Sequence, residues 1–223
     1  MQGMLRWALG LAIAALMLVA PVIFYRHEYT YYKRLREVAP GVLYRSGQLP
    51  ADGFVAAVTS YQIRTVINVQ DDYPDPELWL TYFNRKTIKE SDLCGQLGVH
   101  YLFIQPDLIS RRRIPAERPA AIDHFLAVMD DPANHPVLLH CRAGLHRTGV
   151  LAAIYRMEYQ GWTPEQAIDE LKACGFGEFA CSSANDYITQ YILTYRRGVR
   201  RQKAEGRRQK AEFAAFCLLP SAF

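Results

Sequence analysis

One short segment, residues 137–149, combines a potential nucleophile with groups that bind oxyanions. Cys141 is followed by Arg147 after the five residues Arg-Ala-Gly-Leu-His. A thiolate can attack phosphorus, and a guanidinium can hold two phosphoryl oxygens at once, which a lysine cannot do with the same geometry. The spacing therefore predicts a phosphate-binding loop in which Cys141 is the nucleophile and Arg147 binds the oxyanion.

The sequence on either side of this loop predicts a strand before it and a helix after it. Residues 137–139 are apolar and favour a short buried strand, and residues 148–159 favour a helix. At such a junction, backbone N–H groups and the positive end of the helix dipole can bind an anion without a metal. Gly144 tolerates the backbone curvature that the loop needs. We expect the same field to favour the thiolate form of Cys141 at neutral pH.

The residues between the cysteine and the arginine are expected to complete the phosphate site. Their backbone N–H groups would point at the oxyanion. Two of their side chains, Arg142 and His146, would add positive charge. The predicted phosphate-binding residues are Arg142, Ala143, Gly144, Leu145, His146 and Arg147.

Two residues that flank the loop are expected to assist the cysteine. We expect His140 to orient Cys141 and to tune its thiolate, rather than to transfer protons. We expect Thr148 to donate a hydrogen bond to the sulfur and so to ease its departure in a second, hydrolytic step. Thr148 could also cap the following helix, and both roles could hold together.

The order His140-Cys141, five residues, Arg147-Thr148 resembles the signature of the cysteine-dependent protein tyrosine phosphatase superfamily, in its dual-specificity branch. The resemblance covers roughly residues 40–195. Residues 41–50, Gly-Val-Leu-Tyr-Arg-Ser-Gly-Gln-Leu-Pro, resemble the opening of the atypical dual-specificity phosphatases of plants, fungi and bacteria. The resemblance implies phosphomonoester hydrolysis through a cysteinyl-phosphate intermediate, and some of these enzymes act on inositol phosphates.

The leaving group needs a proton, and a carboxylic acid must supply it. Asp107 follows Pro106 after a predicted strand, and this resembles the position of the family's mobile acid. Asp72 is the next candidate, Asp71 follows it, and Glu117 is a weaker option. A turn role for Asp107 is the alternative, because aspartate favours turns.

The charge around the loop bears on the substrate. Residues 111–113 are three consecutive arginines, so a substrate with more phosphate than one phosphotyrosine is as plausible as a merely solvated loop. The expected partners are a phosphorylated protein or a phosphoinositide or inositol phosphate. We expect no cofactor, no metal and no nucleic acid. A membrane-tethered adaptor that binds phosphate without turnover is the alternative function.

Residues 7–24 carry no charge and are long enough to span a bilayer. We predict a single-pass membrane anchor. A cleaved signal peptide is the alternative, although Leu18 would stand three residues before a cut after Ala20. Positive residues that follow Arg26 weakly favour a cytoplasmic catalytic domain.

The remaining pattern predicts an α/β fold with a central, mostly parallel sheet of four to five strands flanked by helices, plus the N-terminal transmembrane helix. Strands are expected at residues 42–45, 65–69 and 100–105, and helices at 50–61, 76–98, 115–129 and from Pro164, with Ser182 or Ser183 capping a last helix.

The predicted divisions are an anchor and its flank at residues 1–30, a catalytic domain at 31–197 and a basic tail at 198–223. Of the net charge of +4, residues 196–223 contribute 8 basic minus 2 acidic residues, or +6. The tail repeats Arg-Arg-Gln-Lys-Ala-Glu and is expected to be a solvated helix, a disordered segment or a contact with an anionic membrane surface.

Five cysteines, an odd number, argue against a disulfide framework and favour a reducing compartment.

Overall fold

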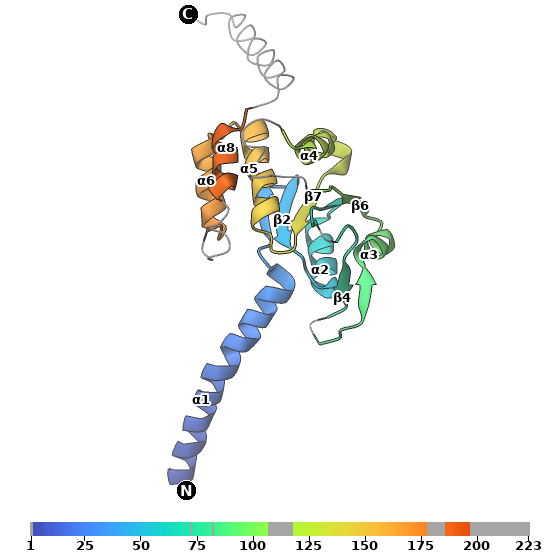
Figure 1. The fold of residues 1–223 in the computed structure, drawn as a ribbon. Helices are drawn as coiled ribbons and strands as arrows, with labels where there is room; N and C mark the ends of the chain where they lie inside the picture. The colour runs from blue at the N-terminus through green and yellow to red at the C-terminus, as the bar shows by residue number, and fades with distance from the viewer. Residues whose placement is uncertain (1, 72, 82, 107–117, 178–185, 197–223) are drawn as a thin grey trace, which may run out of the picture.

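The chain after the N-terminal helix is built around one five-stranded sheet (Figure 1). The computed structural model describes residues 2–71, 73–81, 83–106, 118–177 and 186–196. In order across the sheet, the strands are β1 (Arg36–Ala39), β2 (Leu43–Gly47), β7 (Val137–Cys141), β3 (Thr65–Asn68) and β6 (His100–Phe103). β1 pairs antiparallel with β2, and the other neighbours are parallel. The predicted mostly parallel sheet is therefore confirmed.

The central strand β7 ends at the predicted nucleophile. All five of its residues are buried, as are all four residues of β3, which explains why β7 begins with an apolar run at residues 137–139 rather than an alternating pattern. In the registers with β2 and β3, Gly47 pairs with Cys141 and Asn68 pairs with His140. The carboxyl ends of three neighbouring parallel strands therefore meet at one edge of the sheet, the usual ligand edge of such sheets.

Helices cover both faces of the sheet (Figure 1). One core, which contains Leu138, lies under α2 (Ala51–Tyr61) and α3 (Glu90–Leu97). The other core contains Val137 and Leu139, so successive residues of β7 point to opposite faces. The helices of this second face are α4 (Ala120–Asp130), α5 (His146–Gln160), α6 (Pro164–Ala173) and α8 (Asp186–Thr194).

The predicted long helix at residues 76–98 is wrong. Its first part is an antiparallel hairpin of β4 (Glu77–Trp79) and β5 (Thr87–Lys89), and only α3 is helical. Side chains in the turn bind nearby backbone: Thr81 Oγ1 accepts hydrogen bonds from the N–H groups of Phe83 and Asn84. Such local bonds compete with the helical ladder and favour a turn.

Other helix boundaries differ from the predicted ones by a few residues. α5 begins at His146 rather than at residue 148, so the loop is shorter than expected. α4 begins at Ala120 rather than near residue 115, after a segment that is not described. The helix start at Pro164 is confirmed, with Thr163 and Gln166 forming a capping box. The predicted serine cap and the basic repeat lie outside the described residues.

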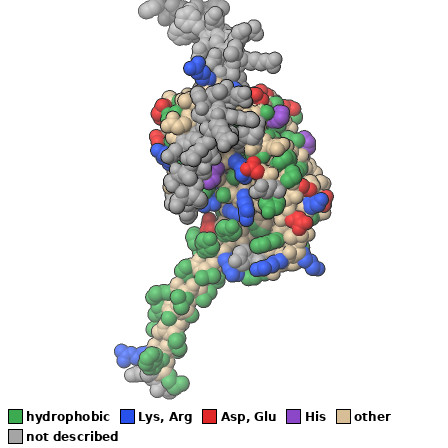
Figure 2. All heavy atoms as spheres, viewed as in Figure 1, with side chains coloured by type: hydrophobic (Ala, Val, Ile, Leu, Met, Phe, Trp, Pro, Cys, Tyr) green, Lys and Arg blue, Asp and Glu red, His purple; other side chains and the backbone are tan. Residues whose placement is uncertain are grey.

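The N-terminal helix α1 (Gln2–His27) projects away from the domain, with its apolar side chains exposed (Figures 1 and 2). Among the described residues it is the one helix long and apolar enough to cross a membrane, a property that signal sequences share. A π-helical turn, η1 (Glu28–Tyr32), joins it to the domain. Thr30 in this turn is buried, and its carbonyl oxygen would lie 2.2 Å from a Cβ added at Gly53 of α2. The end of α1 is therefore packed closely against the domain.

Candidate active site

The predicted strand, loop and helix around the cysteine are present. Cys141 is the last residue of β7 and is 4% exposed, and α5 begins five residues later. The Sγ atom of Cys141 accepts a hydrogen bond from the backbone N–H of Gly144 at 3.2 Å. The loop therefore curls around the sulfur with at least one N–H group directed at it, as an anion-binding loop requires.

The carbonyl oxygens of the same loop have donors from other segments. An inward turn of N–H groups leaves carbonyl groups pointing outward, and buried carbonyls need partners. The three bonds are Arg34 Nη1 to the oxygen of Ala143 at 3.0 Å, Arg45 Nη2 to the oxygen of Gly144 at 2.9 Å, and the N–H of Gln48 to the oxygen of Arg142 at 3.3 Å. The donors come from β2, from the residue just after it and from the segment after α1, so two parts of the chain hold the loop from outside.

Arg45 is the most deeply buried of these donors. It lies in β2 and is 3% exposed. Burial lowers the pKa of Arg45, while nearby acidic groups, first Cys174 and then Glu170 and Cys141, act against that shift. Arg45 has no role among the predictions from the sequence. The signal available there was a charged residue within the predicted strand at residues 42–45.

Gly144 is required by the loop geometry. Its φ is +72°, in the left-handed region where glycine is favoured. A Cβ at this position would lie 2.5 Å from the backbone nitrogen of Gly47 and 2.7 Å from the carbonyl oxygen of Ser46. The end of β2 and the loop thus approach each other at backbone distance, and no side chain fits between them.

Arg147 is the second residue of α5, and its guanidinium forms an ion pair with Asp71, just after β3. Both side chains are partly exposed. Among the acids predicted from the sequence, Asp71 ranks behind Asp107 and Asp72. Those two residues lie outside the described residues, as do Glu117 and the arginines at 111–113. Of the candidate acids, Asp71 is therefore the one that the structure places beside Arg147. The guanidinium of Arg147 has further N–H donors that can bind a phosphate.

His140 is buried beside a carboxylate that the sequence analysis missed. Its Nε2 atom lies 2.8 Å from Oε1 of Glu90, the first residue of α3, and both side chains are almost fully buried. A carboxylate at this distance fixes the orientation of an imidazole ring. Glu90 therefore positions the residue that directly precedes Cys141.

The two remaining predicted side chains differ from expectation in detail. Thr148 is fully buried in the first turn of α5, but Leu145 holds the capping position, and the Thr148 hydroxyl has no hydrogen-bond partner among the described residues. His146 packs edge-on against Phe176. Burial, and then the charge of Arg147, lower the pKa of His146. Both effects favour the neutral form of the ring, so the described structure gives no support to a positive charge at this position.

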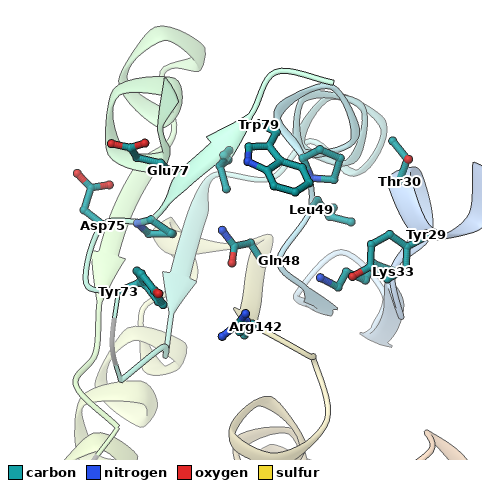
Figure 3. A pocket seen from close by; sticks show the side chains of 13 residues that line it. Tyr29, Thr30, Lys33, Gln48, Leu49, Tyr73, Asp75, Glu77, Trp79 and Arg142 are labelled. Carbon is teal, nitrogen blue, oxygen red and sulfur yellow. The ribbon is translucent and has the colours of Figure 1, made fainter. Parts of the chain in front are cut away.

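A groove of about 660 Å³ opens beside the loop (Figure 3). Arg142 and Gln48 line it next to the loop, and Lys33 lines it on the side of η1. Asp75 and Glu77 lie at its other side, where Asp75 accepts a hydrogen bond from Ser91 and Glu77 accepts one from Thr87. Its remaining lining residues include Tyr29, Tyr73 and Trp79.

The basic side of this groove therefore adjoins the loop, and aromatic rings form part of its wall. Such a surface suits a ligand that carries phosphate next to a ring or chain. Within the part of the chain that the structure describes, no three or more His, Cys, Asp or Glu side chains are grouped as metal ligands.

Comparisons with known proteins agree with this geometry. Residues 33–211 match the family described as the tyrosine phosphatase family. The dual specificity protein phosphatase TpbA of Pseudomonas aeruginosa is 32% identical over 136 residues, which are 61% of this chain and 52% of that protein. The inositol diphosphatase DSP2 of Oryza sativa is 31% identical over 179 residues, 80% of this chain and 72% of that protein. The chain thus spans about half the length of TpbA.

Two solved structures show the same fold. The crystal structure of P. aeruginosa TpbA has a TM-score of 0.51 and 25% identity, and covers 73% of this chain and 84% of its own. The structure of the Siw14 catalytic core has a TM-score of 0.57 and 18% identity, with coverage of 81% and 94%. At that identity the second match supports the fold alone.

Because the backbone approaches Gly144 closely, replacing this glycine by alanine should weaken anion binding. The same change at a matched glycine, Gly98, should not. Gly98, at the end of α3, has a φ of +68°, and a Cβ there would meet nothing within 4 Å. Gly144→Ala and Gly98→Ala therefore carry a similar backbone strain of about 1 kcal/mol, but only the first adds a clash with backbone. We expect Gly144→Ala to weaken tungstate binding at least about 100-fold. Isothermal titration calorimetry of both variants measures this, and equal affinities would contradict it.

Proposed function

Since this chain belongs to the tyrosine phosphatase family, we propose that it hydrolyses phosphomonoesters through a cysteinyl-phosphate intermediate. The observation that carries the proposal is the sulfur of Cys141, which accepts a hydrogen bond from the N–H of Gly144, at the start of a loop that leads to Arg147 in the first turn of α5. This arrangement combines a nucleophile with preorganised donors for the charge that develops on phosphorus.

In the first step, the thiolate of Cys141 attacks phosphorus and the phosphorus–oxygen bond to the leaving group breaks. Arg147 and the loop N–H groups bind the three remaining phosphoryl oxygens, and a carboxylic acid protonates the leaving oxygen. In the second step, the same group, now a carboxylate, takes a proton from water. The water oxygen attacks phosphorus and the sulfur–phosphorus bond breaks, while the Thr148 hydroxyl donates to the departing sulfur.

We assign the acid first to Asp107, on the basis of the family resemblance, and second to Asp71. Asp71 is placed second because it lies beside Arg147, whereas the ion pair itself favours the ionised carboxylate rather than the protonated acid. In the paired state its negative charge stabilises the guanidinium, so Asp71 is also suited to hold Arg147 in place before substrate binds.

The substrate proposed is a molecule with more than one phosphate, an inositol phosphate or phosphoinositide, in addition to phosphorylated proteins. The basic side of the groove supports it, because Arg142 and Lys33 flank a space that continues beyond a single phosphate in the loop. TpbA is named a dual specificity protein phosphatase and DSP2 an inositol diphosphatase, so relatives of both kinds exist.

We also propose that α1 anchors the protein in a membrane as a single span, with a catalytic domain of residues 31–197 in the cytoplasm. The exposed apolar surface and length of α1 support the span. The basic residues that follow it, among them Arg26, Lys33 and Arg34, support the orientation.

The nucleophile assignment predicts that Cys141→Ser lowers kcat for an aryl phosphate at least about 1000-fold, because a serine hydroxyl is not ionised at neutral pH. The assay uses the full chain in detergent, with and without a metal chelator. Cys94→Ala is the matched control. Burial raises the pKa of the Cys94 thiol to about 12, so this sulfur is not a nucleophile, and its removal should leave kcat near the wild-type value. Activity that survives Cys141→Ser, or that the chelator abolishes, would contradict the mechanism; a wild-type chain that binds phosphate without turnover would favour the adaptor.

The acid assignment predicts a dependence on the leaving group. Removing the acid should slow the hydrolysis of alkyl phosphates more than that of activated aryl phosphates, by about 100-fold or more, because a poor leaving group needs the proton. Asp107→Asn should show this difference. Asp71→Asn should mainly change KM, because it alters the partner of Arg147. If Asp71→Asn alone shows the leaving-group effect, the acid is Asp71.

The substrate proposal predicts that Lys33→Ala and Arg142→Ala lower kcat/KM for inositol polyphosphates by about 10-fold each, since each removes a charged contact with phosphate. Turnover of a phosphotyrosine peptide should change less. Steady-state kinetics with both substrates on both variants tests this. Equal and low activity of the wild-type protein on every inositol substrate would refute it.

A further inference from the structure

The β4–β5 hairpin presents exposed aromatic and basic side chains on one side of the domain. Phe83, in its turn, is 83% exposed, and Trp79, at the end of β4, is 49% exposed. Arg85 and Lys86 follow in the same turn and are exposed. Exposed apolar side chains are informative when they gather in one patch, and here two aromatic side chains of one hairpin stand with two positive charges.

The hairpin lies against the end of α1. The Arg26 guanidinium sits over the Phe83 ring, 5.1 Å from its centre, and the Arg85 guanidinium sits over the Trp79 ring at 5.7 Å. Figure 2 shows Lys and Arg side chains gathered along the edge of the domain from which the apolar helix emerges. We call the set formed by Arg26, Trp79, Phe83, Arg85 and Lys86 the hairpin surface.

The position of Arg26 sets the depth of this surface relative to a bilayer. The uncharged run of α1 ends at Phe24, and Arg26 lies two residues further along the same helix. At 1.5 Å per residue, this is about 3 Å beyond the last apolar side chain, the level at which headgroups begin. Because Phe83 contacts Arg26, it lies at the same level. A bilayer spanned by α1 would therefore meet the turn of the hairpin.

The chemistry of the hairpin surface fits a membrane interface with negative charge. Aromatic rings and snorkelling basic side chains are the residues that favour the headgroup region. Residues 77–89 contain three basic residues and one acidic residue, a net charge of +2, and the acidic Glu77 accepts a hydrogen bond from Thr87. Each basic residue near an anionic membrane contributes about 1 kcal/mol to binding.

We propose that the hairpin surface docks on anionic lipid headgroups of the bilayer that α1 spans. Phe83 and Trp79 enter the interfacial layer, and Arg26, Arg85 and Lys86 contact lipid phosphates. The proposal rests on the anchoring by α1 put forward above. Trp79 also lines the groove beside the phosphate loop, so docking would hold one wall of the groove at the membrane surface.

The three tryptophans of the chain allow docking and anchoring to be measured separately. The full chain is reconstituted into vesicles whose lipids carry bromine at shallow acyl positions, which quenches nearby tryptophan fluorescence. Trp7→Phe, Trp79→Phe and Trp162→Phe isolate the contribution of each ring. Trp7 reports on α1, Trp79 on the hairpin, and Trp162 on the loop between α5 and α6, which lies at the end of the domain away from α1 (Figure 1).

We expect Trp7 and Trp79 to be quenched and Trp162 to be unaffected. Quenching of Trp79 should be at least about twofold stronger with phosphatidylglycerol present than with phosphatidylcholine alone, while that of Trp7 stays the same. Arg85→Glu/Lys86→Glu should remove the Trp79 quenching in anionic vesicles. Arg64→Glu, a reversal at an exposed site just before β3, at the opposite edge of the sheet from the loop, is the charge control and should leave it unchanged.

Three outcomes would overturn the proposal. If Trp7 is quenched and Trp79 is not, α1 is an anchor but the hairpin does not dock. If Trp79 is quenched equally in neutral and anionic vesicles, the surface does not select anionic lipid. If neither ring is quenched, the anchor itself fails, and docking fails with it. Aryl phosphate turnover by Arg85→Glu/Lys86→Glu in detergent should equal that of the wild type, which confirms that the variant is folded.

Discussion

A loop that turns its N–H groups toward an anion must turn carbonyl groups away from it, and those carbonyls need donors. In this protein the donors are the Arg34 and Arg45 guanidiniums and the backbone N–H of Gln48. All three lie in residues 34–48, far from the loop in sequence. The geometry of the phosphate site therefore depends on the N-terminal part of the domain folding against β7. Gly144 is the point of closest approach between the two.

The charges around the loop follow from the same packing. The buried imidazole of His140 has Glu90 beside it, and the partly exposed Arg147 has Asp71. Each is thus matched by a carboxylate from a different element, whereas Arg142 extends into the groove. A phosphoryl group placed at Cys141 would meet fixed donors rather than donors that must reorganise, which is the condition for electrostatic stabilisation of a transition state.

The sequence was sufficient where the determinants are local. Cys141, Arg147 and the strand before them form a contiguous motif, and the buried start of that strand, residues 137–139, is an apolar run. It was insufficient where roles depend on distant contacts. Nothing near Glu90 or Arg45 in the sequence points to His140 or to the carbonyl of Gly144. The hairpin within residues 76–98 was misread as helix because bonds to backbone from side chains such as Thr81, which favour a turn there, were not foreseen. The burial that lowers the pKa of His146 is likewise a tertiary property, which the sequence around it does not reveal.

Trapping the intermediate would show whether Cys141 carries the phosphoryl group during turnover. The full chain is mixed with an aryl phosphate and quenched in acid within one turnover, and its peptides are analysed by mass spectrometry. We expect a phosphorylated Cys141, which forms at the rate of the initial burst of phenol and decays at the rate of phosphate release. A wild-type enzyme that turns over without phosphate on Cys141, or with phosphate on another residue, would contradict it.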